Sequence, residues 1–293
     1  MKRDALVADL DAYFRLPEIA NDAPWGDVYD AIGGPHWRDY AEAVWSERWN
    51  GLMIRGDADV ERAATCVFPS EAIVADLPPR TLLFSEHPVA YDDDVMGFNP
   101  LTRGSFERLR ELGASFYHAH GPLDMHPEVS PSRLCAQGLG LRDLEEYFPI
   151  VEGIPGGAAV IGESDLSVED LAARLRAFLG DEIPVVVVRA GVREHAGRVA
   201  VAAGGGAQRP ILEASLERGC ETFVTGNAAT RCRLDFVQEE LAAFRVLADE
   251  AGVAVVDGTH YGTEKPPQLA MVEWFRRRGL AADFRPGHPE RAA

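Results

Sequence analysis

Short apolar segments alternate with helix-like segments along most of the chain, and this alternation restricts the fold more than any other sequence feature. In the C-terminal half, the apolar runs PVVVVRAG (184–191), RVAVAAGGG (198–206) and ETFVTGN (221–227) predict strands. Apolar residues at helical spacing lie between such runs, as in 167–180 and 232–251. Because strands that alternate with helices are typical of α/β proteins, the sequence predicts an α/β fold with mixed sheets.

The N-terminal half shows the same alternation, and a change of composition separates the two halves. The segment VEGIPGG (151–157) combines an acid with glycine and proline, which indicates a boundary. We therefore expect two packed α/β lobes, 1–150 and 151–293. Expected strands of the first lobe are WNGLMIRG (49–56), AATCVFPS (63–70), TLLFSEHP (81–88) and SFYHAHG (115–121), with helices over 101–112 and 130–141 and a final helix of the second lobe over 266–279.

The charge of the chain restricts its partners. Lys and Arg number 29 against 47 Asp and Glu, a formal net charge of −18. Because such a surface repels phosphate backbones and anionic lipid, we expect no nucleic acid and no membrane among the partners. No apolar stretch reaches the roughly 18–20 residues of a membrane span. The four cysteines form no CxxC pair and indicate free thiols in a reducing compartment, so the sequence favours a cytoplasmic protein.

Histidines and acids meet at the ends of expected strands. Glu86 stands beside His87, and Asp124 follows His120 by four residues. Glu264 follows His260 by four residues as well, so that pair converges through a turn or across one helical turn. Open α/β sheets place ligands at strand ends, because the backbone there directs side chains into a crevice.

Imidazole and carboxylate groups are ligands for zinc, manganese and iron(II). Three His/acid pairs offer up to six ligands, which is more than one tetrahedral ion needs. Two ions bridged by a carboxylate, roughly 3.5–4 Å apart, account for the surplus. The sequence therefore predicts two divalent metal ions (Zn, Mn or Fe) in the cleft between the lobes, and Glu264 is the expected bridge.

The motifs FSEHP, HAHGPLD and THYGTE, in this order, resemble the three metal motifs of the NIF-three family. Members of that family are often called GTP cyclohydrolase type 2 homologues or dinuclear metal centre hexameric proteins. The resemblance runs from about Trp49 to Trp274. It implies metal ligation by His87, Asp124, His260 and Glu264, with His120 lining the site, and a ring of six chains.

The sequence departs from the family pattern at Glu86, where members usually carry a second histidine. A glutamate can still bind metal through oxygen, and we expect Glu86 to be a ligand that favours manganese or iron(II) over zinc. It could instead be a general base, or one metal could be lost. A further departure is TGNAATR (225–231), where members commonly have an acid and a nearby histidine.

These features predict a metal-dependent hydrolase that acts on a small-molecule substrate: a phosphoester, a cyclic amide or a nucleotide-like ring. Glu86, His87, Asp124, His260 and Glu264 are the expected metal ligands, and His120 is the expected catalytic residue for proton transfer or for orienting water. The alternative is a metal-binding or partner-binding protein without catalysis, whose ring-shaped assembly is the working feature. A homo-oligomer, most simply a hexamer, suits both functions.

Overall fold

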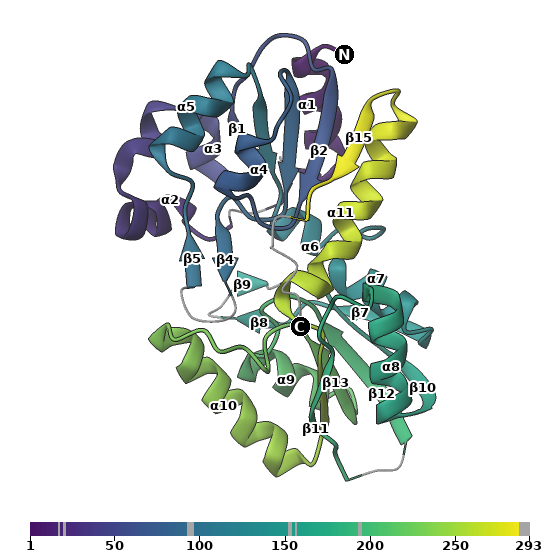
Figure 1. Cartoon of the computed structure of the whole chain (residues 1–293). Helices are drawn as coiled ribbons and strands as arrows, with labels where there is room; N and C mark the ends of the chain where they lie inside the picture. Colours follow the sequence, from purple (N-terminus) through teal and green to yellow (C-terminus); the bar gives the residue numbers. More distant parts are fainter. Residues whose placement is uncertain are drawn as a thin grey trace. The chain divides into compact units, whose positions relative to one another are not determined.

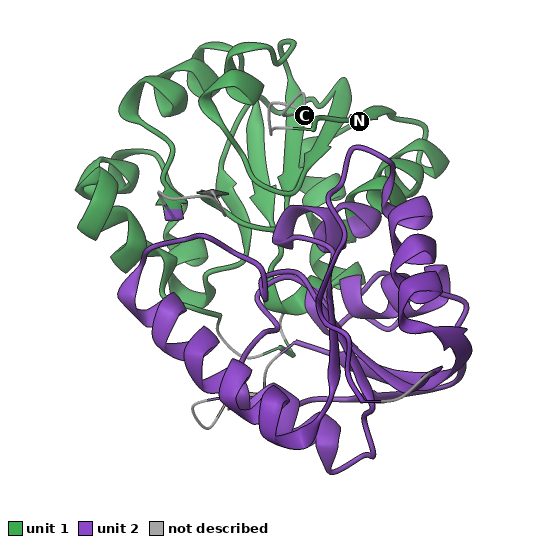
Figure 2. Cartoon of the chain, turned by 60° about the horizontal axis from the view of Figure 1, so that its bottom comes forward, with its two compact units in different colours: residues 1–92, 98–123, 268–293 green, residues 93–97, 124–267 purple. Residues whose placement is uncertain are grey.

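The computed structural model describes residues 1–16, 18–19, 22–92, 97–151, 154–155, 157–192 and 195–286, and the statements below concern these residues. It is a mixed α/β protein, as the sequence predicted, with one sheet of five strands, one of six and two of two strands (Figure 1). The chain forms two compact units (Figure 2). Unit 1 comprises Met1–Asp92, Phe98–Leu123 and Gln268–Ala293, and unit 2 comprises Asp93–Gly97 and Asp124–Pro267.

Each of the two units is built from more than one segment of the chain. The expected boundary, 151–157, includes residues 152, 153 and 156, which lie outside the described residues. Apart from the short segment Asp93–Gly97, which belongs to unit 2, the chain passes between the units at Leu123/Asp124 and again at Pro267/Gln268. The lobes 1–150 and 151–293 therefore stay a prediction of the sequence.

The five-stranded sheet of unit 1 is parallel except for one edge strand. Its order is β1-β6-β3-β2-β15, with β1 antiparallel to β6. The carboxyl ends of the four parallel strands therefore meet at one edge. The strands are β1 (Gly51–Ile54), β2 (Arg62–Cys66), β3 (Thr81–Ser85), β6 (Ser115–His118) and β15 (Ala281–Phe284).

Successive side chains of β3 and β6 point to opposite faces of the sheet, as in any β-strand, and pack into two different apolar layers. Leu83 and Phe116 join the core that helices α2 to α5 help to build. On the other face, Phe84 stacks on Tyr117, with ring centroids 6.0 Å apart. Elements of unit 1 besides the large sheet are α1 (Arg3–Tyr13), α2 (Trp25–Val28), η1 (Tyr29–Gly33), η2 (Pro35–Asp39), α3 (Ala43–Arg48), α4 (Glu71–Ala75), β4 (Ala90–Asp92) and α5 (Arg103–Glu111); β5 (Gly97–Asn99), which pairs with β4, and α6 (Gly121–Asp124) span unit boundaries.

The six-stranded sheet of unit 2 is mixed and has helices on both faces. Its order is β11-β14-β13-β12-β10-β7, and of the neighbouring pairs only β12/β13 and β13/β14 are parallel. Val199 packs in the core with α7 and α8, whereas its neighbour Ala200 packs with α9 and α10. The elements are α7 (Pro131–Gly138), β7 (Arg142–Tyr147), β8 (Ile150–Val151), β9 (Ile154–Pro155), β10 (Ala159–Ser167), α8 (Val168–Leu179), β11 (Val186–Arg189), β12 (His195–Ala202), α9 (Arg209–Leu216), β13 (Thr222–Thr225), α10 (Asp235–Ala251) and β14 (Ala254–Asp257).

The last helix, α11 (His260–Arg277), begins six residues before the expected start at Pro266. Pro266 and Pro267 lie inside it, although proline lacks the N–H that a helix interior uses. In a regular helix the N–H of residue 267 would donate to the carbonyl of Thr263. Here Cys135 Sγ donates to that carbonyl over 3.4 Å, so the oxygen keeps a donor. No helix in the described part of the chain is long and apolar enough to cross a membrane.

Candidate metal centre

Two histidines of unit 1, His87 and His120, follow the ends of two neighbouring parallel strands. Ser85 at the end of β3 pairs in register with His118 at the end of β6. His87 and His120 each come two residues later, so both leave the sheet at the same edge. Their ring centroids lie 4.7 Å apart. The strand-end placement expected from the sequence is thus confirmed for both residues.

Glu86 lies in the interior of unit 1 with no exposed surface. Gln268 Nε2 donates a hydrogen bond to Glu86 Oε2 over 3.2 Å. The carbonyl of Gln268 accepts in turn from Thr65 Oγ1 at 3.0 Å, which fixes the backbone of the donor. A buried carboxylate needs such donors, because burial without them is costly.

The His120 ring is held by an acid that the sequence did not indicate. His120 Nδ1 lies 3.0 Å from both carboxylate oxygens of Asp22. Trp25 packs edge-on against the rings of His87 and His120, with centroid distances of 5.8 Å and 5.2 Å. Asp22 was missed because it stands in an irregular connection, 98 residues from its partner.

In unit 2, the ends of β12, β13 and β14 bring a glycine turn, Asp257 and the start of α11 together. Asp257 ends β14 and accepts from the N–H groups of Thr259 (2.8 Å) and Ala229 (3.0 Å). Burial raises the pKa of Asp257 even though these donors favour its charged form. Thr259 has a φ of +62°, and the chain turns there into α11 at His260.

His260 and Glu264 face each other across one helical turn, one of the two arrangements that the sequence left open. His260 Nε2 and Glu264 Oε1 lie 2.9 Å apart. The side chains are 12% and 5% exposed, so water screens them little. Residues four apart on a helix lie on one face, which explains why this spacing works.

Gly204 leaves room for this pair. Its φ is +59°, and a Cβ built on it would lie 1.9 Å from Glu264 Oε1 and 3.2 Å from His260 Nε2. Thr263 Oγ1 accepts from the N–H of Gly204 at 2.9 Å and so ties the turn to α11. The turn after β12 therefore fits tightly around the His260 and Glu264 side chains.

Asp124, the last residue of α6, is half-buried. Its carbonyl accepts from the N–H of Ala158 at 3.3 Å. A Cβ on Gly157 would lie 2.9 Å from Asp124 Cβ, so a glycine is required for this close approach. Asp124 and Gly157 both belong to unit 2.

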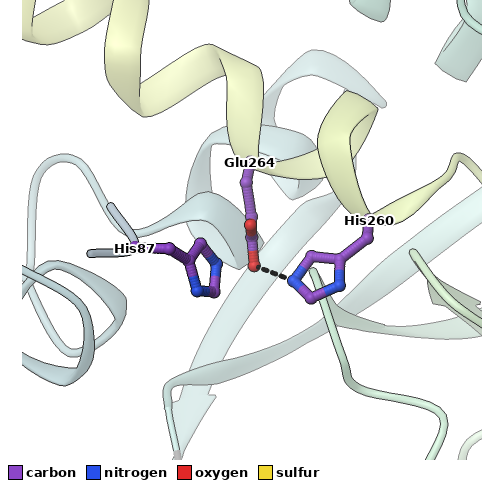
Figure 3. A group of neighbouring side chains, drawn as sticks. All are labelled: His87, His260 and Glu264. Carbon is purple, nitrogen blue, oxygen red and sulfur yellow. Dashed lines mark ion pairs between the residues drawn. The ribbon is translucent and has the colours of Figure 1, made fainter. Parts of the chain in front are cut away.

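Three of the five expected metal ligands form one group: His87, His260 and Glu264 (Figure 3). One ligand atom from each residue lies within 4.8 Å of the others. Two imidazoles and a carboxylate are donors that zinc, manganese or iron can use, so this group could hold a metal ion. Glu86 and Asp124 are not in the group, and their ligation stays a prediction.

Mixed sheets covered by helices, together with this His/Glu group, define an α/β protein with a candidate metal site. The chain belongs to the Duf34/NIF3 (NGG1p interacting factor 3) family, whose sequence profile matches residues 38–282. The resemblance inferred from the three His/acid motifs is confirmed by this match.

The chain is similar in sequence to curated relatives over most of their length. A GTP cyclohydrolase 1 type 2 homolog of Deinococcus radiodurans is 30% identical over 220 residues, covering 73% of this chain and 75% of the relative. A protein of the same name from Halobacterium salinarum is 31% identical over 238 residues, covering 77% and 83%. Among solved structures, protein ybgI, described as of unknown function, has a TM-score of 0.67 at 20% identity and covers 99% of both chains. TTHA1606 from Thermus thermophilus has a TM-score of 0.61 at 25% identity, again covering 99% of both.

Proposed function

We propose that the protein is a metal-dependent hydrolase that uses two divalent ions to act on a small molecule. The observation that carries this proposal is the group of His87, His260 and Glu264, with ligand atoms within 4.8 Å of one another. Glu86 and Asp124 complete the proposed ligand set. The predicted lobes, 1–150 and 151–293, would each contribute ligands to a site in the cleft between them.

The donors fit such ions. Imidazole nitrogen and carboxylate oxygen suit zinc, manganese and iron(II), and a further carboxylate at Glu86 would favour the harder ions. When bound, two divalent ions supply Lewis acidity and a template that orients the reacting groups. Gly204 supports the proposal from the protein side, because any larger residue there would displace Glu264.

His120 is the proposed proton-transfer residue. Its side chain is 24% exposed, so the ring is reachable from solvent while one side packs on Trp25. An imidazole nitrogen can accept or donate a proton, which suits general acid–base catalysis. Phosphoesters, cyclic amides and nucleotide-like rings are the substrate classes that such a site suits. The names of the relatives support the last of these.

A substrate screen with the zinc-, manganese- or iron-loaded protein tests this function. The screen covers phosphoesters, cyclic amides and nucleotides, and each hit is repeated with Glu264→Ala. We expect that variant to lose activity because it loses the proposed bridge between the ions. Glu273→Ala, on the exposed part of α11, is the matched control and should keep full activity.

Full metal content and full activity in Glu264→Ala would overturn the two-metal proposal. The alternative, a metal-binding or partner-binding ring without catalysis, would be favoured by a different outcome. In that outcome no substrate class is turned over, and the metal-free protein still binds a cellular partner.

A further inference from the structure

We propose that Asp22 is a positioning residue for His120: it accepts the Nδ1–H of the imidazole, fixes the ring orientation and leaves the lone pair on Nε2. This inference rests on the proposed function, in which His120 transfers a proton. It concerns a residue from outside the part of the chain that the family profile matches, 38–282.

The contact has the geometry of a carboxylate that orients an imidazole. His120 Nδ1 is 3.0 Å from Asp22 Oδ1 and 3.0 Å from Oδ2. Only 9% of the Asp22 side chain is exposed, so the pair is screened little by water. A histidine with one nitrogen held by a carboxylate has a fixed tautomer, because that nitrogen must carry the proton.

Asp22 is itself held rigidly. The N–H groups of Ala23 and Gly121 each donate to its carboxylate over 2.6 Å. Asn50 Nδ2 donates to Oδ2 at 3.2 Å, and Asn50 Oδ1 accepts from the backbone N–H of His120 at 2.8 Å. Asn50 therefore ties the backbone of His120 to the acid that holds its ring. Such support is what keeps a functional side chain in one orientation.

The charge of Asp22 agrees with this role. Burial raises the pKa of the Asp22 carboxyl, but its contact with His120 and the backbone N–H donors outweigh burial, so the pKa lies below its usual range. Asp22 is consequently an anion at neutral pH and acts only as an acceptor. The aromatic residue three positions later, Trp25, covers the ring of His120 from the side. The segment 22–25 thus supplies both a hydrogen-bond acceptor for the His120 ring and an aromatic side chain that packs against it.

Imidazole tautomers are measured directly by long-range ¹H–¹⁵N correlation on the full-length, zinc-loaded protein labelled with ¹⁵N-histidine. In the wild type we expect His120 to be protonated on Nδ1. Asp22→Asn keeps the size of the side chain, but its amide can donate to Nδ1, which would move the proton to Nε2. Asp27→Asn, an exposed acid five residues further along, is the matched control and should leave the tautomer unchanged.

If Asp22 only stabilises the fold and does not orient His120, a different result is expected. In that case Asp22→Asn lowers stability and leaves the His120 tautomer as in the wild type, which overturns the inference. Finding Nε2–H in the wild type overturns it without any variant. This second outcome decides the question even where Asp22→Asn does not fold.

Turnover separates this inference from the proposed function. With bis(4-nitrophenyl) phosphate as the probe, we expect Asp22→Asn to lower kcat by about 10²–10⁴-fold with little change in KM or metal content. His120→Gln should have a similar effect, and the double variant should be no slower, because both act through one group. Additive losses would overturn the inference. Absence of wild-type turnover with this phosphoester would count against the proposed function, whereas the tautomer would still decide the role of Asp22.

Discussion

His118, the last residue of β6, lies in the interior of unit 1 and accepts a hydrogen bond there. It has no exposed surface, and Trp45 Nε1 donates to its Nε2 over 2.5 Å. Burial lowers the pKa of His118 to about 3. The ring is therefore neutral in the folded protein at neutral pH, and its Nε2 acts as an acceptor within the core.

This pKa predicts a pH dependence of stability. The folded protein resists protonation of His118 down to about pH 3, whereas the unfolded chain binds the proton near 6.5. The stabilisation is complete above pH 6.5 and is lost as the pH falls from 6.5 toward 3, by on the order of 1 kcal/mol per pH unit. His118→Gln keeps an acceptor for Trp45 and should flatten this slope in chemical denaturation. Parallel curves for both proteins would contradict the prediction.

Glu86 carries the prediction on metal preference. Glu86→His replaces an oxygen donor by nitrogen, so the protein should keep two metals and shift its preference toward zinc. Competition between manganese and zinc in both forms measures the shift. An unchanged preference, with lower stability because Gln268 loses its acceptor, would place Glu86 outside the ligand set.

At the scale of elements, the turn after β12 and the first turn of α11 depend on each other. Gly204→Ala would place a methyl group 1.9 Å from Glu264 Oε1 at a φ of +59°. We expect Glu264 to move, metal affinity to fall by about 10-fold or more and stability to fall by about 1 kcal/mol or more. Titration of the metal-free protein with zinc measures the affinity.

Gly219→Ala is the matched control for Gly204→Ala. Its φ is +81°, and the nearest atom to a Cβ there is Arg198 Cδ at 3.5 Å. It should lose stability through backbone strain and bind metal normally. Equal metal affinity in both variants would show that the close fit around Glu264 has no role in binding.

Elements that are buried on both faces could be predicted from the sequence. The continuous apolar runs at β3, β12 and β13 indicated strands, and the spacing of His260 and Glu264 indicated a shared face. The strand β7 was missed because RDLEEY is mostly exposed and polar and lacks an apolar alternation. The start of α11 was placed too late, because its two prolines resemble a helix beginning rather than an interior.

Contacts between distant segments could not be predicted from local patterns. Asp22 and Trp25 stand in an irregular connection, and nothing in their spacing points to a histidine near residue 120. The acceptor role of Glu86 toward Gln268 is equally remote, since 182 residues separate the two. The periodicity of apolar residues and the local composition predict local structure. These contacts depend instead on how the strands are ordered in the sheet.

At the scale of the whole molecule, we predict a closed homo-oligomer, most simply of six chains. The basis is the family resemblance together with the general dominance of closed symmetric assemblies. Light scattering at several concentrations should give a mass near six times the 31.9 kDa of one chain. A single species with the mass of one chain would contradict this prediction.

The central claim is that His87, His260 and Glu264 belong to a site for two divalent ions. Metal analysis of the untagged protein, purified without chelator, tests this claim most directly. We predict about two ions of zinc, manganese or iron per chain, and loss of both in Glu264→Ala. Well under one ion per chain in the wild type, after incubation with each metal in excess, would contradict the account.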